Sequence, residues 1–115
     1  GPAEIEDALL THPLVNDVGV VGVPDSERGS VVKAFIVLSS GMTEQSGVCD
    51  ELKAYVKNIL GPHKQPRILE IVKKLPRTRT GKISRAALRD IDRVGTESRT
   101  ARYFDTDSNK GISTK

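Results

Sequence analysis

Two runs rich in β-branched residues constrain the fold of this chain more than any other feature. They cover Val15–Val23 and Val31–Leu38, and the polar segment Pro24–Gly29 (PDSERG) separates them. Valine and isoleucine favour strands because their branched side chains fit a pleated surface, whereas proline and glycine interrupt one. The pattern therefore predicts an antiparallel hairpin with a loop longer than a two-residue turn.

Helical patterns flank this hairpin in the sequence. Pro2 and the acidic residues that follow it are typical of a helix start, and that helix should end near His12. Apolar positions recur at helical spacing over Val48–Leu60, where a Gly-Pro pair ends the element. Because Lys53 and Lys57 are four residues apart, we expect both on the exposed side of this second helix.

The second half of the chain predicts one more strand and one more helix. Arg67–Val72 has the composition of a short strand, and Ser84 is placed to cap a helix that runs to about Ile91. Residues 94–115 are polar and lack clear periodicity, so we expect a flexible tail, ordered in part around Tyr103-Phe104. The order of elements predicts an α+β domain, a small sheet (hairpin plus short strand) with about three helices packed against it.

Composition narrows the possible functions. No apolar run approaches the roughly 20 residues that span a bilayer, and a single cysteine, Cys49, excludes an internal disulfide. With only two histidines, a metal centre is not expected. Residues 64–93 carry ten basic side chains against three acidic ones. Such a basic half either faces an anionic partner or is a solvated charged surface.

The most basic stretch is LPRTRTGKISRAALR, residues 75–89. A phosphate-binding P-loop would need glycine at position 76 and serine or threonine after the lysine, but the residues there are Pro76 and Ile83. Stacking on single-stranded bases needs aromatic side chains, and none lies between Leu60 and Arg102. Binding of a nucleic-acid duplex through phosphates alone stays open.

A third interpretation of this stretch concerns Lys82. Pro76 stiffens the chain before it, Gly81 permits backbone angles that other residues avoid, and the predicted cap at Ser84 anchors the far side. A lysine on such a tethered loop could be delivered into a site on another domain. On spacing alone, a solvated surface lysine is the better explanation of the pattern.

Residues 75–89 resemble the C-terminal signature of the AMP-forming acyl-CoA synthetases, which belong to one superfamily with luciferases and nonribosomal-peptide adenylation domains. The usual form is Leu-Pro-Lys-Thr-x-Thr-Gly-Lys-Ile-x-Arg-x-x-Leu-Arg, from which Arg77 departs by replacing lysine. GPAEIEDALLTHPLV, VVGVPDSERGSVVKAFIVL and ILGPHKQPRILEIVKKLP resemble further family segments in the same order. The resemblance covers residues 1–93 and is greatest to the medium-chain branch. It implies that residues 1–93 form the mobile C-terminal lid domain of such an enzyme, followed by the tail 94–115.

The resemblance implies an ATP-dependent ligase that activates a fatty acid as an acyl-adenylate and then transfers the acyl group to coenzyme A. Lys82 matches the family's adenylation lysine, which bridges the carboxylate of the acid and the nucleotide. The ATP site, with its Mg²⁺, belongs to the family's large N-terminal domain, so this fragment should be inactive alone. A lysine acyltransferase acting on Lys82 is a further expected partner, and the bacterial cytoplasm is favoured over the mitochondrial matrix. The alternative is a free-standing basic module that contacts nucleotides or nucleic acid.

The resemblance also implies a coenzyme A face. The positions that match it are Arg28, Lys57, Gln65, Pro66 and Arg67. Arginine and lysine suit the phosphates of coenzyme A, although loop arginines and lysines are also commonly just solvated. Gln65 and Pro66 would contribute backbone or shape rather than charge, and the alternative is that they form an ordinary turn with no role in binding.

Overall fold

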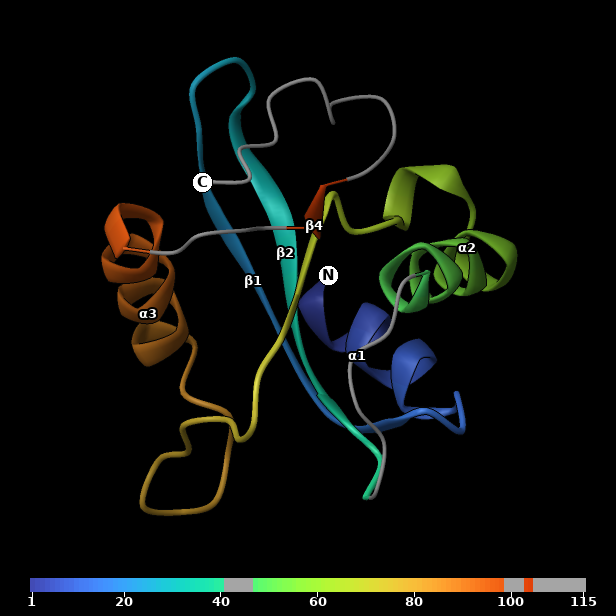
Figure 1. Cartoon of the computed structure of the whole chain (residues 1–115), viewed down its shortest axis with the longest axis horizontal. Coiled ribbons are helices and arrows are strands. Elements are labelled where there is room, and N and C mark those ends of the chain that lie inside the picture. Colours follow the sequence, from blue (N-terminus) through green and yellow to red (C-terminus); the bar gives the residue numbers. More distant parts are fainter. Residues whose placement is uncertain (41–46, 99–102, 105–115) are drawn as a thin grey trace.

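The structure is a computed structural model that describes residues 1–40, 47–98 and 103–104 (Figure 1). Its elements in chain order are α1 (Pro2–Leu10), β1 (Val15–Asp25), β2 (Gly29–Leu38), α2 (Val48–Leu60), the 3₁₀ helix η1 (Pro62–Lys64), β3 (Ile68–Ile71), α3 (Arg85–Ser98) and β4 (Tyr103–Phe104). The predicted α+β class, with a small sheet and three α-helices, is confirmed.

The predicted hairpin is confirmed and is longer than expected. β1 and β2 pair antiparallel up to Asp25 opposite Gly29, so three residues form the turn instead of six. The Asp25 carboxylate accepts hydrogen bonds from the backbone N–H groups of Glu27 and Arg28 at 3.1 and 2.9 Å. This local side-chain cap extends the pairing through Pro24, which the sequence pattern assigned to the loop.

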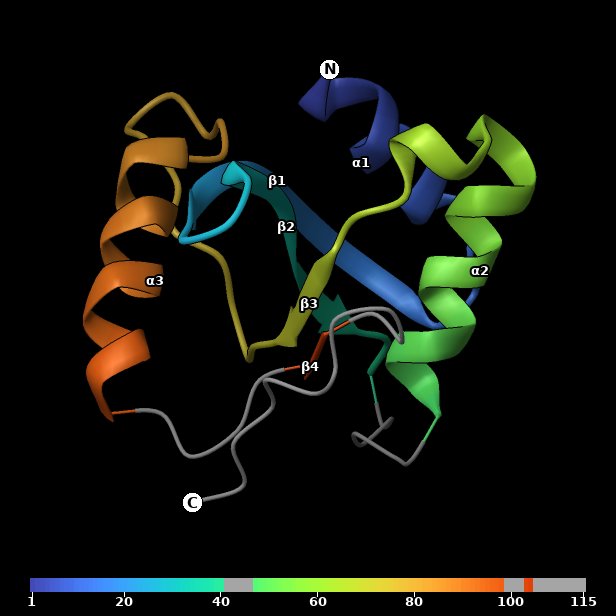
Figure 2. The same ribbon diagram turned by 90° about the horizontal axis from the view of Figure 1, so that it is seen from above.

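The sheet has the order β1-β2-β3-β4, and β1 is one of its edges. β3 pairs parallel to β2, with Lys33 opposite Ile68, and β4 pairs antiparallel to β3. α1 and α2 cover one face of the sheet and α3 covers the other, as Figure 2 shows. Alternate residues of each strand therefore enter two separate apolar cores, one under α1 and α2 and one under α3.

Gly19 allows α3 to approach β1 closely. A Cβ atom built at Gly19 would lie 2.7 Å from Leu88 Cδ1 and 3.1 Å from Ile83 Cγ2. Leu88 is fully buried in the second core, so it has little room to move. The absence of a side chain at this position thus sets the distance between α3 and the sheet.

We expect Gly19→Ala to destabilise the chain by about 1–3 kcal/mol, since overpacking forces side chains off their rotamers or shifts the backbone. Equilibrium urea unfolding measures this loss. Gly22→Ala is the matched control in the same strand, because nothing lies within 4 Å of a Cβ there. Equal stability changes in the two variants would contradict the close-packing explanation.

Helix α2 corrects one prediction from the sequence. Lys57 is exposed as expected, but Lys53 is buried, with 3% of its surface accessible. Four residues turn a helix by about 40° more than one full turn, so the two side chains do not point the same way. Lys53 falls on the buried side together with Leu52 and Val56. Ile59, which we grouped with the apolar stripe, is exposed.

Helix α3 begins as predicted and ends later. The Ser84 hydroxyl accepts the backbone N–H of Ala87 at 3.2 Å, which confirms the predicted N-cap. The helix continues past the expected end near Ile91 to Ser98 and so crosses the boundary drawn after Arg93. Tyr103–Phe104 form β4, while residues 99–102 and 105–115 of the predicted tail lie outside the described residues.

Within the described ranges, no helix has the length and apolar character needed to cross a membrane.

Candidate functional site

The loop that carries Lys82 is a small closed turn between β3 and α3. Arg77 and Ile83 form an isolated antiparallel bridge at its base, and the Ser84 N–H donates to the Pro76 carbonyl at 3.0 Å. The Gly81 N–H donates to the Thr78 carbonyl at 3.0 Å and closes the turn. The loop is therefore an ordered hairpin-like element, although it contains no regular strand.

Both backbone polar groups of Lys82 are occupied within this loop. Its N–H donates to the Thr78 hydroxyl at 3.2 Å, and its carbonyl accepts the Thr78 N–H at 2.7 Å. Gly81 adopts φ +91°, a conformation that side-chain-bearing residues rarely take, as its sequence position predicted. The Lys82 side chain is exposed, and across the described part of the chain its amine has no ion-pair partner. The structure thus presents an exposed ammonium group on a fixed backbone.

Arg77 braces the same loop from one side. Its guanidinium donates to the Gly81 carbonyl at 2.8 Å and to the Asp17 carboxylate at 2.5 Å. Asp17 lies near the start of β1, sixty residues away in the sequence. From the sequence, Arg77 stood out only as the departure from the family signature, and no local pattern pointed to Asp17.

Arg85 anchors the start of α3, three residues after Lys82. Its Nη2 lies 2.8 and 2.7 Å from the two carboxylate oxygens of Glu6 in α1, and its Nε donates to the Val20 carbonyl at 3.1 Å. Glu6 in turn accepts the Val20 N–H at 2.8 Å. The pair satisfies backbone groups on the free edge of β1 and joins helices from opposite faces of the sheet around that edge.

A buried ion cluster holds the middle of α3. Lys33 Nζ lies 2.7 Å from Glu70 Oε1 on β3 and 2.7 Å from Asp92 Oδ1 on α3. The Lys33 side chain is fully buried, and its ammonium lies 4.4 Å from the centre of the Phe35 ring. Sequence patterns assigned Lys33 only to a strand. Its charge is compensated by residues from two other elements, which no local pattern shows.

The candidate coenzyme A residues come from three different elements. Arg28 is exposed in the β1–β2 turn, and Lys57 is exposed on the last turn of α2. Pro66 is buried, whereas Gln65 and Arg67 on either side of it are half-buried. The Arg67 N–H donates to the Val32 carbonyl at 2.9 Å, which places the approach to β3 beside the first half of β2.

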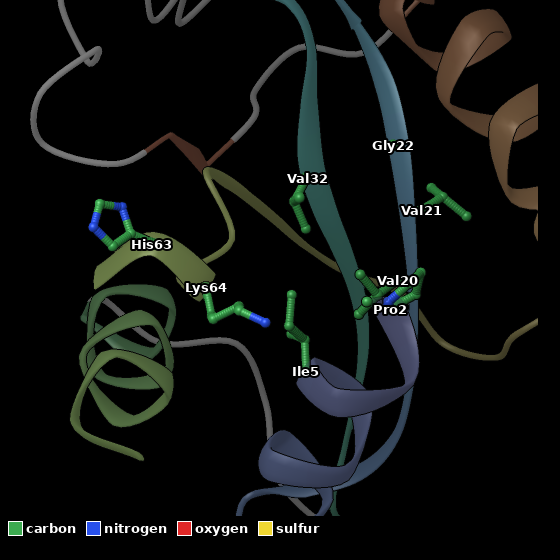
Figure 3. A pocket seen from close by; sticks show the side chains of 9 residues that line it. Pro2, Ile5, Val20, Val21, Gly22, Val32, His63 and Lys64 are labelled. Atoms are coloured by element: carbon green, nitrogen blue, oxygen red, sulfur yellow. The ribbon is translucent and has the colours of Figure 1, made fainter. Parts of the chain in front are cut away.

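An apolar cavity of about 180 Å³ opens between η1, α1 and the β1–β2 hairpin, and its lining residue Lys64 directly precedes Gln65. Figure 3 shows Ile5, Val20 and Val32 along its wall, with His63 and Lys64 of η1 on the other side. Lys64 Nζ lies 2.7 Å from Glu4 Oε1, an ion pair between η1 and α1. Lys64 lowers the pKa of Glu4 below its usual range, chiefly through this hydrogen bond and secondly through its positive charge.

The Lys82 loop and the β1–β2 turn lie at opposite ends of the sheet. In Figure 1 the loop between β3 and α3 (gold) is at the lower end and the turn is at the upper end. The approach to β3 lies in the upper half, consistent with the hydrogen bond from Arg67 to β2. The structure therefore separates the candidate adenylation lysine from the candidate coenzyme A residues.

Comparison with known proteins gives consistent matches. The AMP-binding enzyme C-terminal domain family matches residues 4–82. The 4-hydroxybutyrate–CoA ligase 1 of Metallosphaera sedula is 48% identical over 89 residues, which are 77% of this chain and 16% of the ligase. The human mitochondrial acyl-coenzyme A synthetase ACSM2A is 48% identical over 92 residues, which are 78% of this chain and 16% of the synthetase.

Solved structures agree with the sequence matches. The acyl-CoA synthetase of Brucella canis superposes with a TM-score of 0.77 at 43% identity, over 84% of this chain and 18% of that one. The anthranilate CoA ligase AuaEII, solved with anthranoyl-AMP, superposes with a TM-score of 0.76 at 33% identity, over 84% of this chain and 19% of that one. The chain thus spans less than a fifth of each relative's length. On this evidence, the chain belongs to the AMP-binding enzyme C-terminal domain family, as found in acyl-CoA synthetases.

Proposed function

We propose that this chain is the mobile C-terminal lid of an AMP-forming carboxylate:CoA ligase, and that Lys82 serves its adenylation step. The observation that carries the proposal is the exposed ammonium of Lys82, which has no ion-pair partner among the described residues and stands on a loop whose backbone is held on both sides of that residue. Such an amine can enter a site on a second domain without first breaking an ion pair. The proposed substrates are ATP, coenzyme A and a carboxylic acid of the fatty-acid type.

In the proposed first half-reaction, a carboxylate oxygen bonds to the α-phosphorus of ATP and pyrophosphate leaves. Two anionic groups approach each other in this step. A fixed cation between them stabilises the charge in the transition state, which is the largest contribution that a side chain can make here. Lys82 fits this role because its backbone is already ordered before substrates bind.

In the proposed second half-reaction, the thiol sulfur of coenzyme A bonds to the acyl carbon and AMP leaves. Arg28, Lys57 and Arg67 would bind the phosphates of coenzyme A, with Gln65 and Pro66 shaping the surface. Because the Lys82 loop and the β1–β2 turn lie at opposite ends of the sheet, the lid would rotate between the two steps.

The Mg²⁺ that accompanies ATP in this family would not be held by this lid. Among the described residues, no group of three or more histidine, cysteine, aspartate or glutamate side chains could hold a metal ion. The carboxylates of Glu6, Asp17, Glu70 and Asp92 are instead paired with arginine or lysine.

Arg28→Ala in the full-length enzyme should raise the KM for coenzyme A by roughly tenfold, because a charge-assisted phosphate contact contributes about 1.5–3 kcal/mol. The KM for ATP should stay nearly constant. Steady-state kinetics with each substrate varied in turn measures both constants. Arg93→Ala is the control, since Arg93 is an exposed arginine on α3 that pairs with the nearby Asp90. A parallel rise in both KM values would indicate a packing role for Arg28.

A further inference from the structure

The Arg77 side chain connects the Lys82 loop to the sheet at the one peptide group that precedes Lys82. Its Nη1 donates to the Gly81 carbonyl at 2.8 Å, and the N–H of the same peptide group, which belongs to Lys82, donates to the Thr78 hydroxyl at 3.2 Å. The Gly81–Lys82 peptide plane is therefore held from both sides. Its orientation sets the direction in which the Lys82 side chain leaves the backbone.

The other end of the Arg77 brace is itself fixed. Asp17 Oδ2 accepts from Arg77 Nη2 at 2.5 Å, while Asp17 Oδ1 accepts the N–H of Val18 at 3.0 Å. The pairing of β1 with β2 shifts register between Val15 and Asp17. Such irregularities re-aim a side chain relative to a regular strand. Both carboxylate oxygens of Asp17 are thus engaged, and the carboxylate is oriented before Arg77 contacts it.

The geometry of arginine matters for this connection. A guanidinium presents several N–H donors in a rigid plane, so Arg77 can bind Gly81 and Asp17 at once with two different nitrogens. A lysine ammonium is a point donor on a flexible stem and would not hold the two acceptors in the same fixed geometry. The departure from the usual family residue therefore has a structural consequence in this chain.

We propose that Arg77 is a positioning residue that, together with Asp17, aims Lys82 for adenylation. The proposal rests on the proposed function of Lys82 and deepens it. Arg77 acts through the Gly81–Lys82 peptide and not through its own charge on the substrates. Because the Arg77 and Asp17 side chains are 43% and 26% exposed, their ion pair contributes little to global stability. Its effect is on the direction of one side chain.

The test is Arg77→Met in the full-length enzyme, assayed separately in the two half-reactions. We expect adenylation to slow by about tenfold or more, since a misplacement of about 1 Å can cost a comparable factor. The rate of thioester formation from supplied acyl-adenylate should change less than twofold. The thermal unfolding midpoint should stay within the error of its measurement. Asp17→Ala should reproduce the selective loss, and Arg77→Lys should restore part of the adenylation rate.

Arg79→Met is the matched control, because it removes the same charge from the same exposed loop without touching Gly81 or Asp17. Adenylation that slows equally in this variant would overturn the proposal in favour of a general electrostatic effect. The double variant Arg77→Met with Lys82→Ala should be no slower than Lys82→Ala alone. A further tenfold loss in the double variant would also overturn the proposal, since Arg77 would then act independently of Lys82.

Hydrogen exchange of the full-length enzyme separates this proposal from the proposed function. Amides of residues 78–82 should exchange faster in Arg77→Met than in the native enzyme or in Arg79→Met. Unchanged exchange, or faster exchange with normal adenylation, would overturn the role of Arg77 and leave that of Lys82 standing. If Lys82→Ala itself left adenylation intact, the proposed function would fail, and the role of Arg77 would fail with it even if exchange were faster.

Discussion

Replacing Lys82 with alanine in the full-length enzyme should slow acyl-adenylate formation by about 10²–10³-fold, the usual cost of removing one preorganised charge-stabilising donor. The Lys82 amine has no ion-pair partner in the described part of the chain, so alanine removes a catalytic charge without exposing a buried one. Pyrophosphate release from ATP in the presence of the acid measures this step directly.

The same Lys82→Ala enzyme should form thioester from supplied acyl-adenylate at close to the native rate. The reason is the separation of the Lys82 loop from the β1–β2 turn across the sheet, which keeps Lys82 away from the proposed coenzyme A face. Lys74→Ala is the control, as an exposed lysine that precedes the loop. Equal loss in both half-reactions would exclude the assignment of Lys82 to adenylation alone.

Replacing Lys33 with methionine should destabilise the chain by about 3–5 kcal/mol, the range for breaking a buried ion pair by removing one partner. The substitution keeps most of the apolar stem but takes the ammonium away from Glu70 and Asp92, which are only 19% and 7% exposed. Two carboxylates would then face each other across α3 and β3. Equilibrium urea unfolding at neutral pH measures the loss.

Two further variants make the Lys33 result specific. Lys57→Met is the matched control on an exposed lysine and should change stability by no more than about 0.5 kcal/mol. The triple variant Lys33→Met, Glu70→Gln and Asp92→Asn should recover part of the loss, because no uncompensated charge stays buried. A loss below about 1 kcal/mol in Lys33→Met would mean that the cluster does not hold α3 to the sheet.

The buried ion cluster also explains where helix prediction from the sequence was incomplete. Beyond Ile91 the residues are mostly polar, so the apolar periodicity that marks a buried helix face ends there. In the structure Asp92 occupies the buried face, because Lys33 supplies a charge partner at 2.7 Å. A polar residue that is buried by pairing cannot be distinguished from an exposed one when only local spacing is known.

Local sequence patterns were sufficient to predict the main helices and strands and the candidate lysine. Two runs rich in β-branched residues predicted the hairpin, the Ser84 cap predicted the start of α3, and the glycine before Lys82 predicted its positive-φ turn. Each depends on interactions between residues close in the chain, so local composition carries the information. The resemblance to acyl-CoA synthetases then assigned a chemical role to Lys82, which stays a proposal for this chain.

Contacts between side chains from distant segments, in contrast, became apparent in the folded chain. The contact of Arg77 with Asp17 joins residues sixty positions apart, and the contact of Lys33 with Asp92 joins residues fifty-nine apart. Both depend on α3 and its preceding loop packing against one face of the sheet at a distance that Gly19 permits. Such contacts follow from which faces pack together, a property of the assembled layers that no stretch of sequence contains on its own.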